Sequence, residues 1–228
     1  MSTAPALLYT PPGSTKSYDF ARVGAFAERP LEGNALAVFT DARGLTTTEM
    51  QSIAREMNLS ETTFVLPREP GIESKRGVQV RIFTVQEELE FAGHPTLGTA
   101  SWLYLTHPVL RGAPTITLEL RVGPIPVSFA PQQQGPGVYG TMRQNDPVFG
   151  EVHSPFAIAA ALGLSASDLD PVLPVQTVST GMAFCIVPLR SLEVAARLAI
   201  PQALAQAYLA KSDAKFFYCT TRAAGNSG

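Results

Sequence analysis

The sequence is poor in the side chains on which disulfide and metal chemistry depend. Its 228 residues include two cysteines and three histidines, too few for a disulfide framework or a thiolate zinc site. We expect Cys185 and Cys219 to be buried, inert thiols because both lie among apolar residues. No metal-ligand cluster and no glycine-rich phosphate loop stand out in the sequence.

The sequence also has no large excess of positive or negative charge and no long apolar run. The formal net charge is −2 and the basic residues are scattered, so nothing favours binding to nucleic acid or to an anionic membrane. No apolar run reaches the roughly 18 residues of a spanning helix. Residues 1–17 lack the basic start and apolar segment of a signal peptide. We expect a cytoplasmic protein in which residues 1–17 form a flexible lead-in.

Proline and glycine are plentiful, with nineteen and eighteen copies, and they divide the chain into many short segments. This punctuation is typical of a β-rich fold with few helices. One helix is clearly marked by the capping-box pair Thr46 and Glu49. The apolar side chains after this pair recur with helical spacing: Met50, Ile53, Ala54 and Met57.

The second half of the chain repeats the order of the first. In each half a polar turn and a short apolar strand are followed by helix-forming residues and another strand. The matching segments are 33–39 with 179–189, 46–57 with 191–211, and 61–67 with 215–221. The sequence therefore predicts two domains, 18–130 and 131–228, separated in the polar loop that begins at residue 131. The second contains no counterpart of the apolar helix expected at 95–106.

That helix, within "FAGHPTLGTASWLYL" (91–105), is apolar on nearly all sides, which predicts that sheet surrounds it. Pro95 suits a first helical position because it lacks the N–H that would be unpaired there. Gly93 leaves room for a ligand beside the backbone. His94, expected at the cap position, could contact that ligand or move a proton. The alternative is a cap histidine bonded only to backbone.

Several segments together resemble the PhzF family of phenazine biosynthesis-like proteins. They are "FAERPLEGNALAVF" (26–39), "IAREMNLSETTFV" (53–65), "VRIFTVQEELEFAGHPTLGTA" (80–100) and, more weakly, "VSTGMAFCIVPL" (178–189). The resemblance implies the diaminopimelate epimerase-like α+β fold, with two similar halves that are each a curved, barrel-like sheet around a central helix. The second half is expected to be incomplete, without its final helix and strands. A homodimer with its site in the cleft between the halves is also implied.

The same resemblance implies roles for individual residues. Glu61 matches the carboxyl group that moves a proton along the substrate, and His94 the group that assists it. Substrate contacts are expected from five residues: Asn34, Gly93, Pro95, Thr96 and Gly181. From the residues alone, Glu61 could equally be a surface glutamate, and Asn34 and Gly181 could be ordinary turn residues.

The function that the sequence predicts is a cofactor-independent isomerase, which moves a proton within a small carboxylated metabolite by acid/base catalysis. A catalytically inactive relative that binds a ligand or associates with itself is the alternative. An unassigned β-rich binding module is a third interpretation, which requires that no curved sheet encloses the helix at 95–106.

Overall fold

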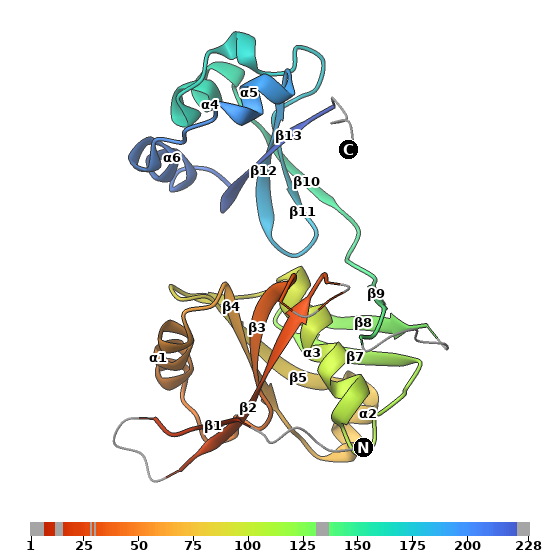
Figure 1. Ribbon diagram of the computed structural model, residues 1–228. Coiled ribbons are helices and arrows are strands. Elements are labelled where there is room, and N and C mark those ends of the chain that lie inside the picture. Colours follow the sequence, from red (N-terminus) through yellow and green to blue (C-terminus); the bar gives the residue numbers. More distant parts are fainter. Residues whose placement is uncertain (1–6, 12–15, 28, 30, 131–136, 223–228) are drawn as a thin grey trace. The chain divides into compact units, whose positions relative to one another are not determined.

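The structure is a computed structural model (Figure 1). It describes residues 7–11, 16–27, 29, 31–130 and 137–222, and the chain divides into two compact units, residues 1–144 and 145–228. Each unit combines one sheet with helices, so the α+β class is confirmed. The polar loop expected between the halves falls at 131–136, outside the described residues.

The first unit contains a nine-stranded sheet with the order β1-β2-β3-β4-β5-β7-β8-β9, to which β6 adds by pairing with β5. The strands are β1 (Leu7–Tyr9), β2 (Tyr18–Ala25), β3 (Asn34–Phe39), β4 (Glu61–Leu66), β5 (Val78–Phe83), β6 (Glu88–Leu89), β7 (Thr115–Leu120), β8 (Gly123–Phe129) and β9 (Gly140–Met142). Strand β1 lies within the stretch expected as a lead-in and pairs with β2. Strand β9 pairs with β8, so it belongs to the first unit, although the boundary expected after residue 130 places it in the second.

Helix α1 (Thr47–Met57) forms as the capping box predicts. The Thr46 side chain accepts from the Glu49 N–H, and the Glu49 carboxylate accepts from the Thr46 N–H. The helix ends at Asn58 in the left-handed conformation, with φ of 50°. Its buried face packs with Phe39, Phe64 and Phe83 in one core cluster. A short second helix, α2 (Pro70–Arg76), carries no apolar periodicity and is not predicted from the sequence.

Helix α3 (Gly93–Thr106) lies against the other side of this sheet (Figure 1). It contacts β2, β3, β4, β7 and β9, which are spread over nearly the whole strand order. A sheet can meet one helix at so many strands only if it curves around that helix. The enclosure is incomplete on one side, because Leu105 keeps 47% of its surface exposed. The expectation of a central helix inside a curved sheet is nevertheless confirmed in this unit.

Helix α3 approaches the sheet closely at Gly98. A Cβ atom added at this position would stand 2.8 Å from Cδ2 of Leu36, a fully buried residue of β3. The next contact along the helix is polar, because the hydroxyl groups of Thr63 in β4 and Thr99 in α3 lie 2.9 Å apart in the core. Small and hydroxyl side chains thus let the helix axis lie close to β3 and β4.

The second unit contains a four-stranded sheet with the order β10-β11-β12-β13. Its strands are β10 (Val148–Val152), β11 (Gln176–Ser179), β12 (Ala183–Leu189) and β13 (Phe216–Thr221), and its helices are α4 (Pro155–Leu162), the short 3-10 helix η1 (Ala166–Asp168), α5 (Leu192–Ala196) and α6 (Gln202–Leu209). The helix-forming residues expected at 191–211 contain both α5 and α6. Two short helices form there, because Pro201 cannot continue a helix and becomes the N-cap residue of α6.

The expected repeat is visible in the strand pairing. In the first unit β2 pairs antiparallel with β3, and β3 pairs parallel with β4 across α1. In the second unit β11 pairs antiparallel with β12, and β12 pairs parallel with β13 across α5 and α6. The two halves are therefore built on the same strand–strand–helix–strand arrangement.

The two faces of the second sheet differ in burial. One face packs on α4 and its neighbours and contains the fully buried Cys185 and Val187. On the opposite face two rows of directly paired residues cross all four strands: Phe149, Val178, Phe184 and Phe216, then Val152, Gln176, Ile186 and Tyr218. Every side chain in these rows is exposed or half-buried.

The two cysteines differ in burial. Cys185 is buried, whereas Cys219 is only half-buried, so the expectation that both thiols are buried is wrong for Cys219.

The contact between Gly98 and Leu36 generates a stability prediction. Gly98→Ala should lower the free energy of unfolding by about 1–2 kcal/mol, because overpacking of a closed core outweighs the gain in helix propensity. Gly71→Ala in α2 is the matched control, since a Cβ there meets nothing within 4 Å, and it should be neutral or stabilising. Urea unfolding of both variants measures the difference. A Gly98→Ala protein as stable as the Gly71→Ala protein would contradict the close packing of α3 on β3.

Candidate active site

The parallel pairing of β3 with β4 brings two of the expected site residues together. Leu36 is the partner of Glu61 in the register of these strands, so the beginning of β3 and the beginning of β4 lie side by side. Asn34 is the first residue of β3 and Glu61 the first of β4. Both polar side chains therefore stand at the same edge of the sheet, next to the end of α1.

Helix α3 supplies the third side chain, with a start that differs from the expectation. The N-cap residue is Ala92, not His94, and the first helical residue is Gly93, not Pro95. Proline is accepted at the third helical position because N–H groups of the first turn have no partner within the helix in any case. No side chain caps this terminus. The partial positive charge of the helix start is therefore left to other partners.

Glu61, His94 and Asn34 form one contiguous cluster. Oε2 of Glu61 lies 3.1 Å from Nδ1 of His94, and Nδ2 of Asn34 lies 3.3 Å from the same ring nitrogen. The hydroxyl group of Ser60 donates to Oδ1 of Asn34 across 3.3 Å. The structure thus joins three of the residues that the sequence analysis selected, together with Ser60, which it did not select.

The two titratable groups of the cluster are both shifted toward their neutral forms. Burial raises the pKa of the Glu61 carboxyl group above its usual value. Burial also lowers the pKa of the His94 ring, and the nearby backbone of Ala35 opposes this shift in part. Desolvation acts against the charged form of either group, so the environment favours an uncharged carboxyl group beside an uncharged imidazole ring.

Two polar atoms of the cluster are buried without a hydrogen-bond partner among the described residues. They are Oε2 of Glu61 and Nε2 of His94. The 3.1 Å separation between Oε2 and Nδ1 is an ion-pair distance and does not meet the geometry of a hydrogen bond. A buried polar atom without a partner is costly, and groups of this kind are typical of sites that receive a ligand.

The remaining expected residues differ in what surrounds them. A Cβ atom at Gly93 would meet only the Met142 methyl group, at 3.8 Å, so packing does not demand glycine there. Thr96 is fully buried and donates its hydroxyl hydrogen to the carbonyl of Ala92. Gly181 lies in the second unit between β11 and β12, with φ of 141°, a conformation that favours glycine.

Ser60 is the member of the cluster that sequence reasoning missed. It precedes Glu61 directly, and a hydroxyl residue beside a candidate acid/base group is the signal that could have drawn attention to it. Ser60 and its partner Asn34 are 26 positions apart in the sequence. Only the parallel register of β3 and β4 brings these two side chains together.

A second histidine, His153, lies in the loop between β10 and α4 and is buried at 3% exposure. Its Nε2 lies 2.8 Å from the Thr177 hydroxyl, which donates its own hydrogen to Asp213. Nε2 must therefore carry a proton, and Nδ1 accepts from the Tyr208 hydroxyl at 3.0 Å. Because every group in this network has a partner, it serves the packing of the second unit.

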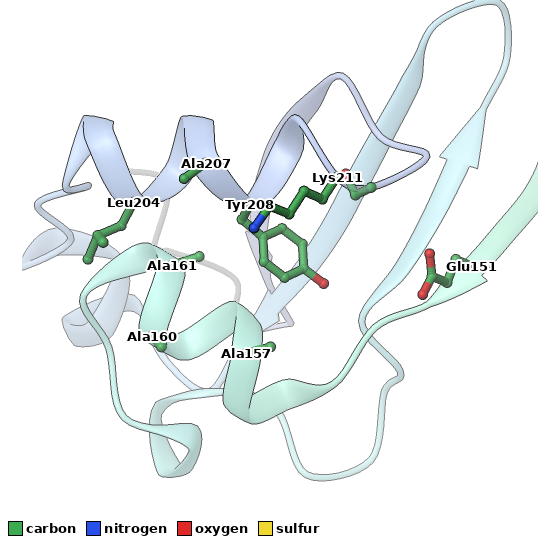
Figure 2. A pocket seen from close by; sticks show the side chains of 9 residues that line it. Glu151, Ala157, Ala160, Ala161, Leu204, Ala207, Tyr208 and Lys211 are labelled. Carbon is green, nitrogen blue, oxygen red and sulfur yellow. The ribbon is translucent and has the colours of Figure 1, made fainter.

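Figure 2 shows a cavity of about 390 Å³ between α4 and α6 that borders this network. Small apolar side chains line most of it, and the polar groups come from Glu151, Tyr208, Lys211 and Ser212. The Tyr208 hydroxyl already donates to His153. No pair comparable to Glu61 and His94, with unpartnered buried atoms, lies among its lining residues as described.

The described part of the chain shows neither a metal-binding cluster nor a membrane-spanning helix. It contains no group of three or more histidine, cysteine, aspartate or glutamate residues placed to hold a metal ion. No helix in it is long and apolar enough to cross a membrane.

Comparison with known proteins finds relatives of this chain with assigned names and with solved structures. The trans-2,3-dihydro-3-hydroxyanthranilate isomerase of Pseudomonas aeruginosa is 40% identical over 174 residues, which are 74% of this chain and 56% of that enzyme. The structure of a predicted epimerase from P. aeruginosa is 36% identical, with a TM-score of 0.75 over 88% of this chain and 68% of that one. A PhzF-family protein of Bacillus anthracis is 30% identical, with a TM-score of 0.70 over 91% of this chain and 68% of its own.

This chain spans little more than half the length of the isomerase from P. aeruginosa. A family model described as PhzC-PhzF, phenazine biosynthesis-like protein, matches residues 23–227, which include all the candidate site residues. The chain therefore belongs to the PhzC-PhzF family of phenazine biosynthesis-like proteins.

Proposed function

We propose that this protein is an isomerase that moves a proton within a small carboxylated metabolite. Glu61 is its acid/base group, and His94 assists the proton transfer. The observation that carries the proposal is the pair itself. Oε2 of Glu61 lies 3.1 Å from Nδ1 of His94, and burial shifts the pKa of each group toward its neutral form. Adjacent titratable groups whose pKa values are shifted by burial are typical of catalytic sites.

The proposed reaction is a balanced proton shift. The Glu61 carboxylate takes a proton from one carbon of the substrate, so that a C–H bond breaks and an O–H bond forms. The electron pair spreads into the adjacent unsaturated system, and Glu61 then returns the proton to another carbon. A carboxyl group with a raised pKa suits both steps, because it holds a proton more strongly than an ordinary carboxylate does and can still release it.

The start of α3 supports a carboxylated substrate. Its first-turn N–H groups have no side-chain cap, and a helix N-terminus attracts anions. Gly93 leaves open space beside these groups. The substrate in the name of the related isomerase is an anthranilate, which carries a carboxylate. We assign Asn34, Pro95, Thr96 and Gly181 to the surroundings of the substrate, and we propose a homodimer that needs no cofactor.

Glu61→Gln should abolish proton exchange with only a modest effect on substrate affinity. Loss of general acid–base catalysis is worth about 10²–10⁴ in rate. The measurement follows trans-2,3-dihydro-3-hydroxyanthranilate, the substrate of the named relatives, in deuterated water by NMR, and it records both isomerisation and deuterium uptake. Glu69→Gln, at the exposed start of α2, is the control and should behave as the unmodified protein. Undiminished deuterium uptake by Glu61→Gln would rule out the assigned role.

The raised pKa of Glu61 also predicts a pH-dependent effect on stability. The folded state holds this proton more tightly than the unfolded state does, so the contribution of Glu61 is fully favourable below pH 4.5 and is lost as the pH rises through the folded pKa. Relative to the unmodified protein, Glu61→Gln should therefore gain stability between pH 4 and pH 8. Urea unfolding at both pH values tests this, and an unchanged or opposite difference would show that Glu61 is not desolvated.

Gly93→Ala should impair the reaction without weakening the fold. A methyl group at this position contacts only Met142 at an ordinary distance, so the unfolding midpoint should stay the same. The methyl group would stand where the substrate approaches the helix start, and kcat/KM should fall by about tenfold, corresponding to about 1.4 kcal/mol. Steady-state kinetics with the same anthranilate substrate provide the measurement. Full activity in this variant would remove Gly93 from the substrate site.

A second candidate function is a binding or self-associating protein without catalytic activity, and the exposed rows on the second sheet favour it. Phe149 and Tyr218 keep 65% and 57% of their surfaces exposed, and apolar patches of this kind mark interaction sites. Under this alternative, sedimentation shows association that increases with concentration and that Tyr218→Lys weakens. A compact monomer with full isomerase activity would exclude it.

A further inference from the structure

The start of α3 faces two different parts of the sheet. His94 lies beside Asn34 and Glu61, at the beginning of β3 and of β4. Gly93, the residue before it, faces β9 instead, because a Cβ atom at this position would stand 3.8 Å from Cε of Met142. Three strands, β5, β7 and β8, separate β4 from β9 in the order of the sheet. The curved sheet therefore brings its last strand back to the helix end that carries the polar cluster.

The pairing of β9 with β8 determines where the Met142 side chain points. Met142 pairs with Val127, a fully buried residue of β8, and directly paired side chains share one face of a sheet. Two residues away, Gly140 pairs with Phe129. The Phe129 ring lies against Tyr104 of α3, with 4.4 Å between the ring centroids. Because side chains alternate along a strand, Met142 lies on this same face, half-buried and directed toward α3.

A ligand at this end of α3 is bounded by two unlike surfaces. The uncapped N–H groups of the first turn suit a carboxylate. Toward β3 and β4 the ligand meets Glu61 and His94, and toward β9 it meets the methyl group of Met142. A thioether is apolar and polarisable and makes favourable contacts with aromatic rings, whereas it offers a polar group only a weak hydrogen-bond acceptor. The two sides therefore suit different parts of one molecule.

We propose that Met142 is a specificity-determining residue whose methyl group forms the apolar wall of the substrate site. This inference rests on the proposed function, since it takes the start of α3 as the place where the carboxylate binds. The carbon that loses its proton points toward Glu61, and the rest of the carbon skeleton lies on Met142. Because this wall is apolar, the site accepts a carboxylate on a planar, unsaturated ring in preference to one on a polar chain.

Methyl NMR of the full chain tests the contact directly. Selective ¹³C labelling of the five methionines gives five methyl signals, and Met142→Leu identifies one of them by its loss. Anthranilate, a carboxylate on a planar ring, is the probe. Its binding should shift the Met142 signal and give nuclear Overhauser contacts between the ring protons and this methyl group. The signal of Met50, which is buried in the core under α1, is the internal reference and should not move.

Variants at position 142 separate an apolar wall from a merely structural side chain. Met142→Ala should weaken the binding of anthranilate about tenfold, and Met142→Gln, which keeps the length of the side chain, should weaken it as much. Met142→Leu conserves the apolar volume and should bind as the unmodified protein does. The matched control is Thr141→Ala, because Thr141 is exposed on the other side of β9, and it should leave the affinity unchanged.

A second probe tests the selection between ring and chain. β-Alanine keeps an amino group and a carboxylate at the same spacing as anthranilate but lacks the ring. It should bind more weakly than anthranilate to the unmodified protein, and Met142→Ala should leave its affinity unchanged. Equal losses of affinity for both probes in Met142→Ala overturn the inference, because Met142 would then only hold the helix start in place.

The outcomes distinguish this inference from the function on which it rests. Anthranilate that shifts the amide signal of Gly93 but not the methyl signal of Met142 overturns the inference and leaves the carboxylate site intact. Anthranilate that does not bind to the protein overturns both. If the ring contact and the selective loss of affinity are found but the unmodified protein has no isomerase activity, the proposed function fails and the role of Met142 in specificity stands.

Discussion

The parallel pairing of β3 with β4 is the constraint on which the candidate site depends. It places Leu36 opposite Glu61, and thereby brings Asn34 beside Ser60 at the same edge of the sheet. Side chains alternate between the two faces of a strand, so a register shifted by one residue would send Glu61 to the other face. Helix α1 on one face and α3 on the other hold this register, since each packs against the same strands.

The cluster at this edge is costly for the fold. Oε2 of Glu61 and Nε2 of His94 are buried without partners, whereas the network around His153 in the second unit has every hydrogen bond that it can form. Both are buried groups around an imidazole ring, and only one is satisfied. Buried polar atoms without partners are typical of sites that receive a ligand, and this contrast is why the function is proposed at Glu61 and His94.

The sequence predicted those helices and strands whose ends are marked by residues close by in the chain. The capping box at Thr46 determined the start of α1, and the internal repeat located the strands β3 and β4. Helix α3 begins two residues earlier than expected, because a proline at the third position is as acceptable as one at the first. The contact of Asn34 with His94 joins residues 60 positions apart and follows from tertiary register, which no local pattern contains. In the second unit, the helix-forming residues at 191–211 did not by themselves indicate that one helix ends before Pro201 and that another, α6, begins after it.

The notch that Gly98 leaves for Leu36 has an evolutionary consequence. Because Leu36 fills the space that a side chain at position 98 would need, the two positions are not free to change independently. A relative that carries alanine or serine in place of this glycine should carry a smaller residue, such as valine or alanine, at the position of Leu36. A larger residue at position 98 is accepted only together with a smaller one at position 36. The two positions should therefore change together among relatives.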